Sequence, residues 1–547
     1  MSSPALSENW ATLWESFAAA RPERVAVVLG DTEIRWGALD HRAAQLGAAF
    51  SAAGIGPGAR VAQLLYNCPE YVESAYAAFK VRASTVNVNF RYRAPEILHV
   101  LADSGSSILV FHSSFSAVVD EARRSFPGVL LLLQVDAGDG AELLDGALDY
   151  ELFLGEHEPM PPVARSGQDQ LMLYTGGTTG RPKGVVWTHQ GLFGALAFTG
   201  YASLGLDLPV TVDEATRIAV DLSDAGTSPV NMTAPPLMHG TALFLALSTF
   251  VLGGRVVMLA GRRFDPSELL RLVEREKVTQ LSIVGDAFAR PIIDELNEIT
   301  YDLSSLRRIV STGATFSAEH KRSLMTAAPE AMILDMIGAS EGGPFALAIT
   351  PPGQDPPDTA EFFATPTTAL IDPDTLARIP FGSGRAGVLA SSGPMPEGYH
   401  GDDEKTAKTF RTIEGVRYSM PGDVAHVDAD GRVHLLGRGS GCINTGGEKV
   451  YPEEVEVAAR SHTGVHDCVA IGVPDERFGE RVVLIASRAP LMDPAIANEV
   501  IEHVRSQLAV YKAPRQIVFV DTVYRSPSGK ADYAWAQRAY KEGIAAS

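Results

Sequence analysis

Short apolar runs of strand length alternate with helix-like segments along most of this chain. Residues 107–111 and 129–133 are two such runs, and helical patterns at 94–102 and 116–126 precede them. The alternation returns over residues 266–337. Apolar strands separated by helices are typical of a parallel sheet covered on both faces. The pattern therefore predicts an α/β fold with a large N-terminal domain of layered, mainly parallel sheets.

The length of the chain and a change in its pattern predict a second domain. At 547 residues the chain exceeds one ordinary domain. Beyond Gly415 the pattern changes to a predicted hairpin at 423–438, which a smaller α+β unit follows. We predict an N-terminal domain over residues 1–438 and a small mobile C-terminal domain over residues 439–547. The small residues around Ser440 would let the chain swivel.

The sequence contains one strongly apolar window and one segment rich in residues typical of loops. Residues 242–252 form the most apolar window, which is too short to cross a bilayer and is predicted to be a core helix. Residues 204–229, with several Asp, Gly and Pro, are expected to form an irregular surface excursion. The N-terminus has no basic start followed by an apolar run, so we expect neither a secretory signal nor a transmembrane segment.

The net charge and the cysteine content restrict the partners and the compartment. A formal net charge of -20 argues against a nucleic-acid-binding surface and against an anionic membrane surface. A bound nucleotide would therefore need a locally positive pocket. Three cysteines without paired or metal-ligand spacing fit a reducing compartment. We expect a cytoplasmic protein, and the sequence leaves a homodimer open.

A loop rich in glycine and threonine lies between the apolar runs Leu171–Tyr174 and Val185–Trp187. Such a loop can bring backbone N–H groups and hydroxyls close around an anion, and Lys183 adds a positive charge. It is not a Walker P-loop, because Lys183 follows Arg-Pro and precedes neither Ser nor Thr. The loop predicts a polyphosphate site. Its candidate residues are Thr175, Gly176, Gly177, Thr178, Thr179, Gly180 and Lys183.

Further motifs place polar residues at strand ends and in turns downstream of this loop. A carboxylate such as Glu341 suits a hard cation, and one such as Asp423 can accept hydrogen bonds from sugar hydroxyls. A guanidinium such as Arg438 offers a planar fork of donors. The motifs are Ala234–Gly240, Ser311–Thr315, Asp335–Glu341, Tyr418–Asp423, Gly437–Val450 and Arg525–Lys530.

Together these motifs resemble those of the adenylate-forming superfamily. That superfamily includes acyl- and aryl-CoA synthetases, adenylation domains of peptide synthetases and beetle luciferases. Its loop signature reads Tyr-Thr-Ser-Gly-Thr-Thr-Gly-x-Pro-Lys-Gly, and this chain departs from it once, with Gly176 at the serine position. The resemblance extends from the first predicted α/β layers to Lys530 and so covers nearly the whole chain.

The resemblance implies which residues would contact the adenine and the acyl group. Gly313, Ala314 and Thr315 would border the adenine. Ile337 stands where the family commonly stacks a tyrosine on the base, so we expect apolar packing there. His239 and Gly338 would line the acyl pocket. His239 could also be an ordinary structural histidine.

A second set of residues would bind the phosphates, the ribose and the metal. Ser340 would contact the α-phosphate and Glu341 would bind Mg²⁺. Asp423 would accept hydrogen bonds from the ribose hydroxyls, and Arg438 would hold ribose or phosphate.

The resemblance also assigns roles to residues near the C-terminus. Ser440 stands at the hinge position, where many members have Asp or Lys, and Asn444 stands where many have Lys. Lys530 would be the lysine that stabilises negative charge during adenylation. The candidate catalytic residues are Lys530, Glu341, Thr175 and Lys183.

The function implied is that of an ATP-dependent acyl-CoA ligase that uses Mg²⁺ and coenzyme A. A carboxylic acid would first form acyl-AMP, and the CoA thiolate would then displace AMP. The motif variants are most similar to those of bacterial fatty-acid and steroid side-chain CoA ligases, so a lipophilic acid of medium or long chain is expected first. Alternatives are an aryl acid, transfer of the acyl group to a carrier protein, and an inactive adenylate-binding scaffold.

Overall fold

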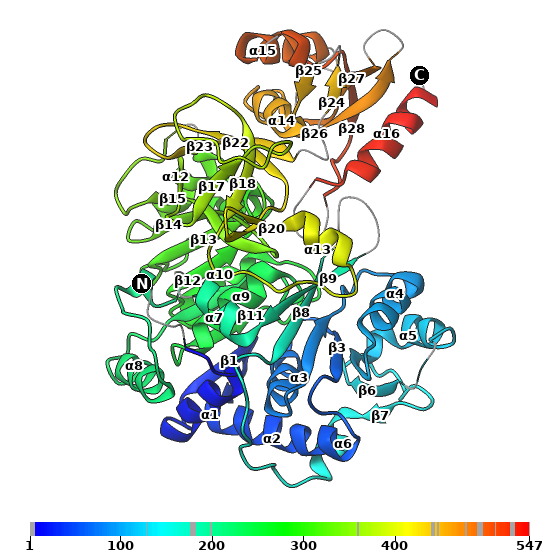
Figure 1. The fold of residues 1–547 in the computed structure, drawn as a ribbon, viewed down its shortest axis with the longest axis vertical. Coiled ribbons are helices and arrows are strands. Elements are labelled where there is room, and N and C mark those ends of the chain that lie inside the picture. The colour runs from blue at the N-terminus through cyan, green and yellow to red at the C-terminus, as the bar shows by residue number, and fades with distance from the viewer. Residues whose placement is uncertain are drawn as a thin grey trace. The chain divides into compact units, whose positions relative to one another are not determined.

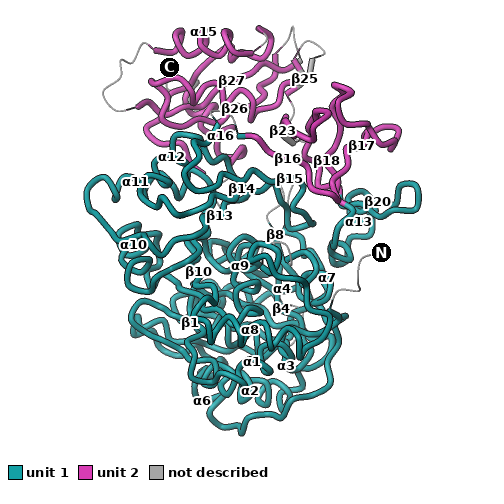
Figure 2. Tube along the Cα trace, turned by 90° about the vertical axis from the view of Figure 1, so that its left-hand side faces the viewer, with its two compact units in different colours: residues 1–360, 392–419 teal, residues 361–391, 420–547 magenta. Residues whose placement is uncertain are grey.

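The computed structural model resolves two compact units. The described residues are 6–126, 128, 130–175, 182–196, 200–357, 360–438, 443–445, 448–475, 479–489, 496–508, 510–525 and 531–545. The first unit comprises residues 1–360 and 392–419, and the second comprises residues 361–391 and 420–547 (Figure 2). The second unit thus begins upstream of the predicted boundary at 438–439. The swivel at Ser440 lies outside the described residues and stays a prediction.

The first unit contains an eight-stranded sheet in the order β19-β9-β8-β4-β3-β5-β6-β7. The pairs from β8 to β7 are parallel, whereas β9 and β19 add to the edge in antiparallel fashion. The strands are β3 (Arg60–Leu64), β4 (Ser84–Asn87), β5 (Ile108–His112), β6 (Leu131–Val135), β7 (Leu148–Asp149), β8 (Gln170–Thr175), β9 (Lys183–Thr188) and β19 (Gly398–Tyr399). The connecting helices are α3 (Pro69–Lys80), α4 (Ala94–Ser104), η1 (Ser113–Phe115), α5 (Ser116–Arg123) and α6 (Tyr150–Gly155).

A second run of strands in this unit follows the order β2-β1-β11-β10-β12-β13-β14-β15. The pairs from β1 to β14 are parallel, and β2 and β15 are antiparallel to their neighbours. The strands are β1 (Val25–Leu29), β2 (Thr32–Arg35), β10 (Val230–Thr233), β11 (Arg255–Met258), β12 (Gln280–Ile283), β13 (Arg308–Thr312), β14 (Met332–Ala339) and β15 (Gly342–Thr350). The parallel strands are almost wholly buried, as expected of a sheet covered by helices.

Helices join these strands and cover the sheets (Figure 1). They are α1 (Trp10–Ala20), α2 (Trp36–Ala52), α7 (His189–Leu196), η2 (Ala202–Leu204), α8 (Val212–Asp224), α9 (Gly240–Phe250), α10 (Pro266–Arg275), α11 (Asp286–Glu298), α12 (Ala318–Ala327) and α13 (Asp403–Thr409). The hairpin of β20 (Phe410–Ile413) and β21 (Val416–Ser419) completes the unit. The layered α/β architecture and the core helix at α9 confirm the sequence predictions.

The expectation of an irregular segment over residues 204–229 is wrong for its central part. Helix α8 begins after Thr211, whose hydroxyl accepts a hydrogen bond from the N–H of Glu214 at 3.2 Å. Its buried positions hold the small residues Ala215, Ala219 and Ser223. Small residues at helical spacing give only a weak apolar signal, so the polar composition concealed the helix.

The second unit contains strands of two sheets. In the first, β16 (Phe362–Ala364), β23 (Arg432–Arg438), β22 (Asp423–Val427), β18 (Gly387–Ser391) and β17 (Thr368–Ile371) pair successively and antiparallel. The second sheet has the order β25-β24-β27-β26, with β28 also on β27. Its strands are β24 (Ile443–Thr445), β25 (Glu448–Val450), β26 (Val465–Asp475), β27 (Gly479–Arg488) and β28 (Gln516–Val520). The helices are α14 (Pro452–Arg460), α15 (Ala497–Gln507), η4 (Val510–Lys512) and α16 (Tyr533–Ala545). The predicted hairpin and the α+β character are confirmed.

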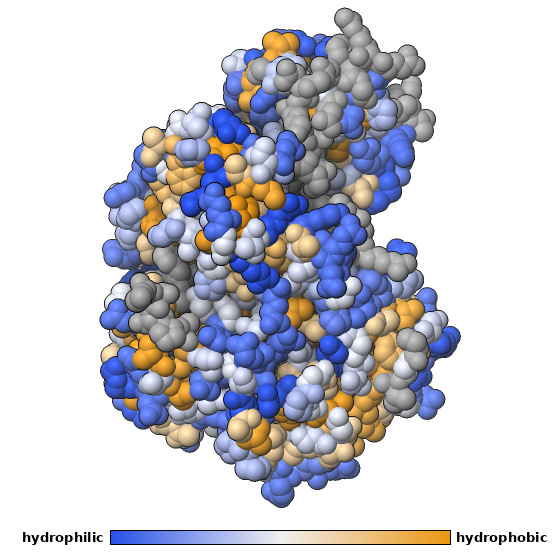
Figure 3. Space-filling view, in the orientation of Figure 1, coloured by the Kyte–Doolittle hydropathy of each residue, from blue (hydrophilic) through white to orange (hydrophobic). Residues whose placement is uncertain are grey.

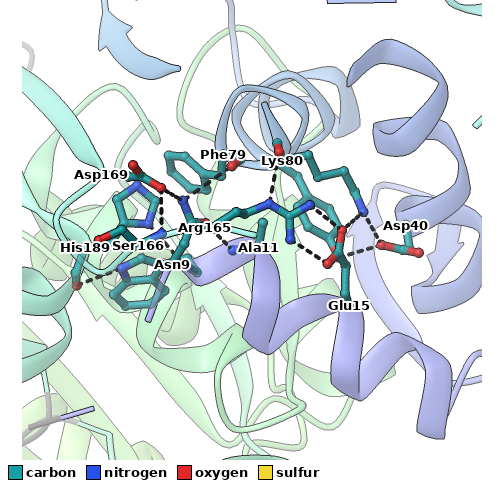
Figure 4. Close-up of polar contacts among 12 residues, drawn as sticks. Asn9, Ala11, Glu15, Asp40, Phe79, Lys80, Arg165, Ser166, Asp169 and His189 are labelled. Atoms are coloured by element: carbon teal, nitrogen blue, oxygen red, sulfur yellow. Dashed lines mark hydrogen bonds and ion pairs between the residues drawn. The ribbon is translucent and has the colours of Figure 1, made fainter. Parts of the chain in front are cut away.

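A buried ion network fixes the N-terminal helix to the first unit. Lys80 donates to Glu15 at 2.6 Å and to Asp40 at 2.7 Å, and Arg165 donates to both oxygens of Glu15. Figure 4 shows Lys80 and Arg165 both directed at the Glu15 carboxylate. The side chains of Lys80 and Arg165 are only 2% and 1% exposed. Buried charges are tolerated when they are paired in this way, and the network holds the segment that leads into β8.

None of the helices in the described ranges combines the length and the apolar character that a bilayer crossing requires. On the face drawn in Figure 3, hydrophobic side chains occur in small groups among hydrophilic ones.

Candidate active site

The antiparallel pair β8 and β9 supports the predicted phosphate loop. In the register of this pair, Thr175 lies opposite Lys183, and these two residues form the last pair before the loop. Residues Gly176, Gly177, Thr178, Thr179 and Gly180 lie outside the described residues. The strands therefore bring both ends of the loop together, as the sequence predicted.

Gly184 has a steric reason to be glycine. It lies opposite Tyr174 in the same strand pair. A Cβ atom at position 184 would come within 2.6 Å of the Tyr174 ring, closer than carbon atoms can approach. The Tyr174 hydroxyl in turn donates a hydrogen bond to Asp103 at 2.6 Å, and burial raises the pKa of the phenol. The tyrosine at the start of the motif and the glycine at its end therefore form one packing unit.

Asn87 connects the loop strand to the turn that carries His239. Its side-chain amide accepts from the N–H of Tyr174 at 2.6 Å and donates to the Tyr174 carbonyl at 3.0 Å. The same amide donates to the carbonyl of Met238 at 2.7 Å. Asn87 is buried, and its position at the end of β4 gave no sequence signal for this role. One side chain thus fixes the β8 backbone and the backbone beside His239 together.

His239 precedes helix α9 and is half-buried. Its carbonyl accepts the N–H of Leu243, and its own N–H donates to the carbonyl of Pro236 at 3.0 Å. Asn67 holds the same turn by accepting from the N–H of Leu237 at 2.8 Å. The turn is therefore well fixed, and its role beside an acyl group stays a prediction.

Lys183 forms an ion pair with Asp402. Asp402 caps helix α13 by accepting from the N–H of Lys405 at 2.9 Å. The hydrogen bond from Lys183 is the main cause that lowers the pKa of the Asp402 carboxyl below its usual value. The predicted phosphate lysine is therefore positioned by a carboxylate that the sequence analysis did not identify.

Glu341 lies in the turn between β14 and β15, where Ala339 pairs with Gly342. Three side chains from other elements hold this turn. The hydroxyl of Tyr399 on β19 donates to Oε1 of Glu341 at 2.6 Å. The indole of Trp187 on β9 donates to the Ser340 carbonyl at 2.9 Å, and the hydroxyl of Ser419 on β21 donates to the Glu341 carbonyl at 2.6 Å. These contacts hold the backbone of Ser340 and both the backbone and the side chain of Glu341.

The predicted adenine segment follows strand β13. Gly313 has a φ of 91°, a left-handed conformation that favours glycine. The Thr315 carbonyl accepts from the N–H of Asp286 at 2.9 Å, and Thr312 donates to the Met336 carbonyl at 2.9 Å. Since β13 and β14 are parallel neighbours, their carboxyl ends bring Gly313, Ala314 and Thr315 beside Ile337 and Gly338. Ligands of open α/β sheets bind at such strand ends.

A buried ion pair supports β14, the strand that leads into the turn with Glu341. Lys321 donates to Asp335 at 2.8 Å, and both side chains are about 4% exposed. Burial raises the pKa of Asp335 to about 6 against the opposing effect of Lys321. Asp335 begins the predicted motif but serves here as a structural residue of β14.

The second unit carries the remaining predicted residues. Asp423 and Arg438 are partners across the β22–β23 hairpin, and Asp423 is half-buried. The side chain of Arg438, and all of Ser440 and Lys530, lie outside the described residues. The hairpin register thus brings the Asp423 and Arg438 backbones together within this unit.

Comparison with known proteins adds an independent finding. The family described as AMP-binding enzyme matches residues 14–400, and the AMP-binding enzyme C-terminal domain matches residues 454–530. The medium-chain acyl-CoA ligase Mig of Mycobacterium avium is 39% identical over 540 residues, covering 96% of each chain. The 3-oxocholest-4-en-26-oate--CoA ligase of Rhodococcus rhodochrous is 37% identical over 541 residues, covering 97% of this chain and 95% of that protein.

A solved structure shows the same fold. The anthranilate CoA ligase AuaEII, crystallised in complex with anthranoyl-AMP, superimposes with a TM-score of 0.79 at 23% identity. The match covers 99% of this chain and 98% of that chain. At this level of identity the likeness concerns the fold.

Proposed function

This chain belongs to the AMP-binding enzymes of the adenylate-forming superfamily and is an AMP-forming acyl-CoA ligase, and we propose that its substrate is a lipophilic carboxylic acid. The medium- or long-chain fatty acids and steroid side-chain acids are the preferred classes. The observation that carries this proposal is the similarity, over nearly the full chain, to ligases named for a medium-chain acid and a steroid side-chain acid.

The first half-reaction joins the acid to AMP. A carboxylate oxygen attacks the α-phosphorus of ATP, the bond to the β-phosphate breaks and pyrophosphate leaves. The two reactants are both anionic, so their approach requires positive charge and hydrogen-bond donors around the phosphates. The loop after Thr175 and the ammonium of Lys183 would supply them. Because Lys183 is paired with Asp402, phosphate binding would have to compete with this carboxylate.

Glu341 has the chemistry expected of a magnesium ligand. Magnesium prefers oxygen ligands and is usually bound by one or two carboxylates together with substrate phosphates. The Tyr399 hydrogen bond engages Oε1 and orients the carboxylate, and within the described residues Oε2 accepts no hydrogen bond. The residue is only half-buried. Bound magnesium would neutralise phosphate charge, while Tyr399 holds the carboxylate in place.

Residues near the strand ends would hold the rest of the nucleotide. Gly313, Ala314 and Thr315 would border the adenine, with the side chain of Ile337 packing beside the base. Ser340 would contact the α-phosphate, and His239 and Gly338 would line the acyl pocket. These assignments are supported by the parallel register of β13 and β14 and by the hydrogen bonds of Asn87.

The second unit would complete the reaction. Asp423 would accept hydrogen bonds from the ribose hydroxyls, Arg438 would bind ribose or phosphate, and Lys530 would stabilise the charge that develops on adenylation. The chain would then swivel near Ser440, so that Lys530 withdraws and CoA can enter. In the second half-reaction the CoA thiolate attacks the acyl carbon, and AMP leaves.

Pyrophosphate release from the purified full chain tests the substrate class. Fatty, steroid side-chain and aryl acids are each supplied with Mg-ATP, with and without CoA. Release that CoA accelerates for the fatty or steroid acids would support the proposal, whereas the same result confined to aryl acids would contradict it. Release that is indifferent to CoA would favour transfer to a carrier protein. No release with any acid would favour an inactive adenylate-binding scaffold.

A further inference from the structure

Two histidines and one aspartate meet on the outer face of the β22–β23 hairpin. In the β22–β23 hairpin (Figure 1), His426 lies directly opposite His434 in the antiparallel register. Asp428 follows the end of β22 and so lies in the connecting turn. Nε2 of His434 and Oδ2 of Asp428 are 2.7 Å apart. The two imidazole rings stack with centroids 4.3 Å apart and an angle of 9° between their planes. The ligand atoms of all three residues lie within 4.8 Å of one another.

We propose that His426, Asp428 and His434 form a binding site for a divalent transition-metal ion of the zinc class. Two imidazole nitrogens and one carboxylate oxygen are common ligands of Zn²⁺, and the fourth position would be left to water. Hard magnesium favours all-oxygen sites, so this site is distinct in chemistry from the proposed magnesium position at Glu341. Within the described parts of the chain, no other set of three His, Cys, Asp or Glu brings its ligand atoms together in this way.

The spacing of the three ligands requires only a small adjustment. Ligands bonded at about 2.1 Å in tetrahedral geometry lie roughly 3.4 Å from one another. The observed His434–Asp428 pair is closer than this, and the whole set lies within 4.8 Å. In the metal-free hairpin a proton on Nε2 joins His434 to Asp428, and a metal ion would replace that proton between the same two atoms. Side-chain rotations that move the ligand atom by about 1 Å would then bring His426 to the ion.

The hairpin supports the ligands and leaves them accessible. Ala425 and Val427 on β22 and Val433 on β23 are buried, so the alternate residues His426 and His434 face outward. The side chains of His434 and Asp428 are 40% and 47% exposed, which gives an ion access from solvent.

The charges around the site are compatible with a cation. Arg432 lies on the same hairpin, and its guanidinium is already paired with Glu361 at 2.7 Å and lies 3.9 Å from Asp430.

Isothermal titration with Zn²⁺ tests this site on the full chain. The protein is first treated with a chelator and exchanged into buffer without nucleotide or chelator. The wild type should show a tight binding step that weakens at least about tenfold in each of His426→Gln, Asp428→Asn and His434→Gln, since loss of even an outer-shell partner costs that much. Substitution with Co²⁺ should give a visible absorption band that the same variants lose.

His503→Gln is a matched control. The His462–His503 pair in the same unit also brings two imidazoles together, with ring centroids 5.1 Å apart, but it is not part of a three-ligand group within the described residues. This variant should bind Zn²⁺ as the wild type does. Tight binding that survives in all three site variants, or no tight binding by the wild type, would overturn the proposal. The three altered side chains are at the surface, and circular dichroism spectra of the metal-free variants should match that of the wild type.

Discussion

Replacement of Tyr399 with phenylalanine should selectively slow adenylation. The change removes one hydroxyl, which donates to Oε1 of Glu341 at 2.6 Å. The aromatic ring would remain. It would keep its packing against Phe410, whose ring centroid lies 6.0 Å from that of Tyr399, and its contact with the Lys405 ammonium, 4.1 Å from the ring centroid. Tyr399 is buried, so phenylalanine should fit the same space. The substitution therefore removes the hydrogen bond on the proposed magnesium ligand while it keeps the ring in place.

The size of the effect follows from the charge of the acceptor. A hydrogen bond to a charged group contributes about 1.5–3 kcal/mol. If the whole contribution acts in the transition state, the rate of adenylation falls roughly 10- to 150-fold. Part of the loss should appear as a higher requirement for Mg²⁺, because an unrestrained Glu341 carboxylate must be ordered when the ion binds.

ATP–pyrophosphate exchange as a function of Mg²⁺ measures this effect, and conversion of supplied acyl-AMP to acyl-CoA measures the other half-reaction. Tyr399→Phe should lower exchange and raise the Mg²⁺ requirement, with little change in thioester formation. Tyr150→Phe is a suitable control, because it removes another phenol-to-carboxylate hydrogen bond, to Glu73 at 3.1 Å, on helix α6. Exchange within about twofold of the wild type at all Mg²⁺ concentrations would refute the role assigned to Tyr399.

Three further predictions concern catalysis, the buried charges and acid stability. Lys530→Ala should abolish ATP–pyrophosphate exchange but still convert supplied acyl-AMP to acyl-CoA, and exchange that survives would contradict the role of this lysine. Glu15→Ala should lower the free energy of unfolding by about 3–5 kcal/mol in urea denaturation, since it leaves buried cations without their shared partner. The exposed Glu404→Ala, which breaks the pair with Lys408, should lower the free energy of unfolding far less, and equal losses would refute the argument. Burial lowers the pKa of His189 to about 3, so between pH 6.5 and 3 the unfolded chain binds a proton that the folded chain does not. As the pH falls, His189 should therefore lower the free energy of unfolding by at most about 1.4 kcal/mol per pH unit. The His189→Gln variant should lose less of its free energy of unfolding between pH 7 and 5 than the wild type does.

The fold was predictable where a local pattern determines it. Apolar runs such as 107–111 and 129–133 became the buried parallel strands β5 and β6, because a strand covered on both faces must be apolar throughout. Helix α8 was missed because its buried face consists of small residues, whose contribution to an apolar pattern is slight. A reader of the sequence could have found it from Thr211, which precedes two acidic residues in the manner of a helix N-cap.

The loop ends at Thr175 and Lys183, and the turn at Glu341, were predictable from the sequence because each lies within one continuous motif. Their partners were not. Tyr399 is 58 residues from Glu341, Asn87 is 151 residues from Met238, and Asp402 is 219 residues from Lys183. No local spacing relates such residues, and only the order of the strands brings them together.

The same reasoning explains why these partners matter for function. A motif provides groups of the right chemistry, but catalysis requires that they be held at fixed positions before the substrate arrives. Tyr399 lies on β19, which pairs with β9, and β9 begins at Lys183. The edge of one sheet therefore orients the Glu341 carboxylate and also carries Lys183, the proposed phosphate lysine. A substitution that shifts β19 should consequently impair magnesium and phosphate binding together, whereas Tyr399→Phe, which leaves the strand pairing in place, should act mainly on magnesium binding.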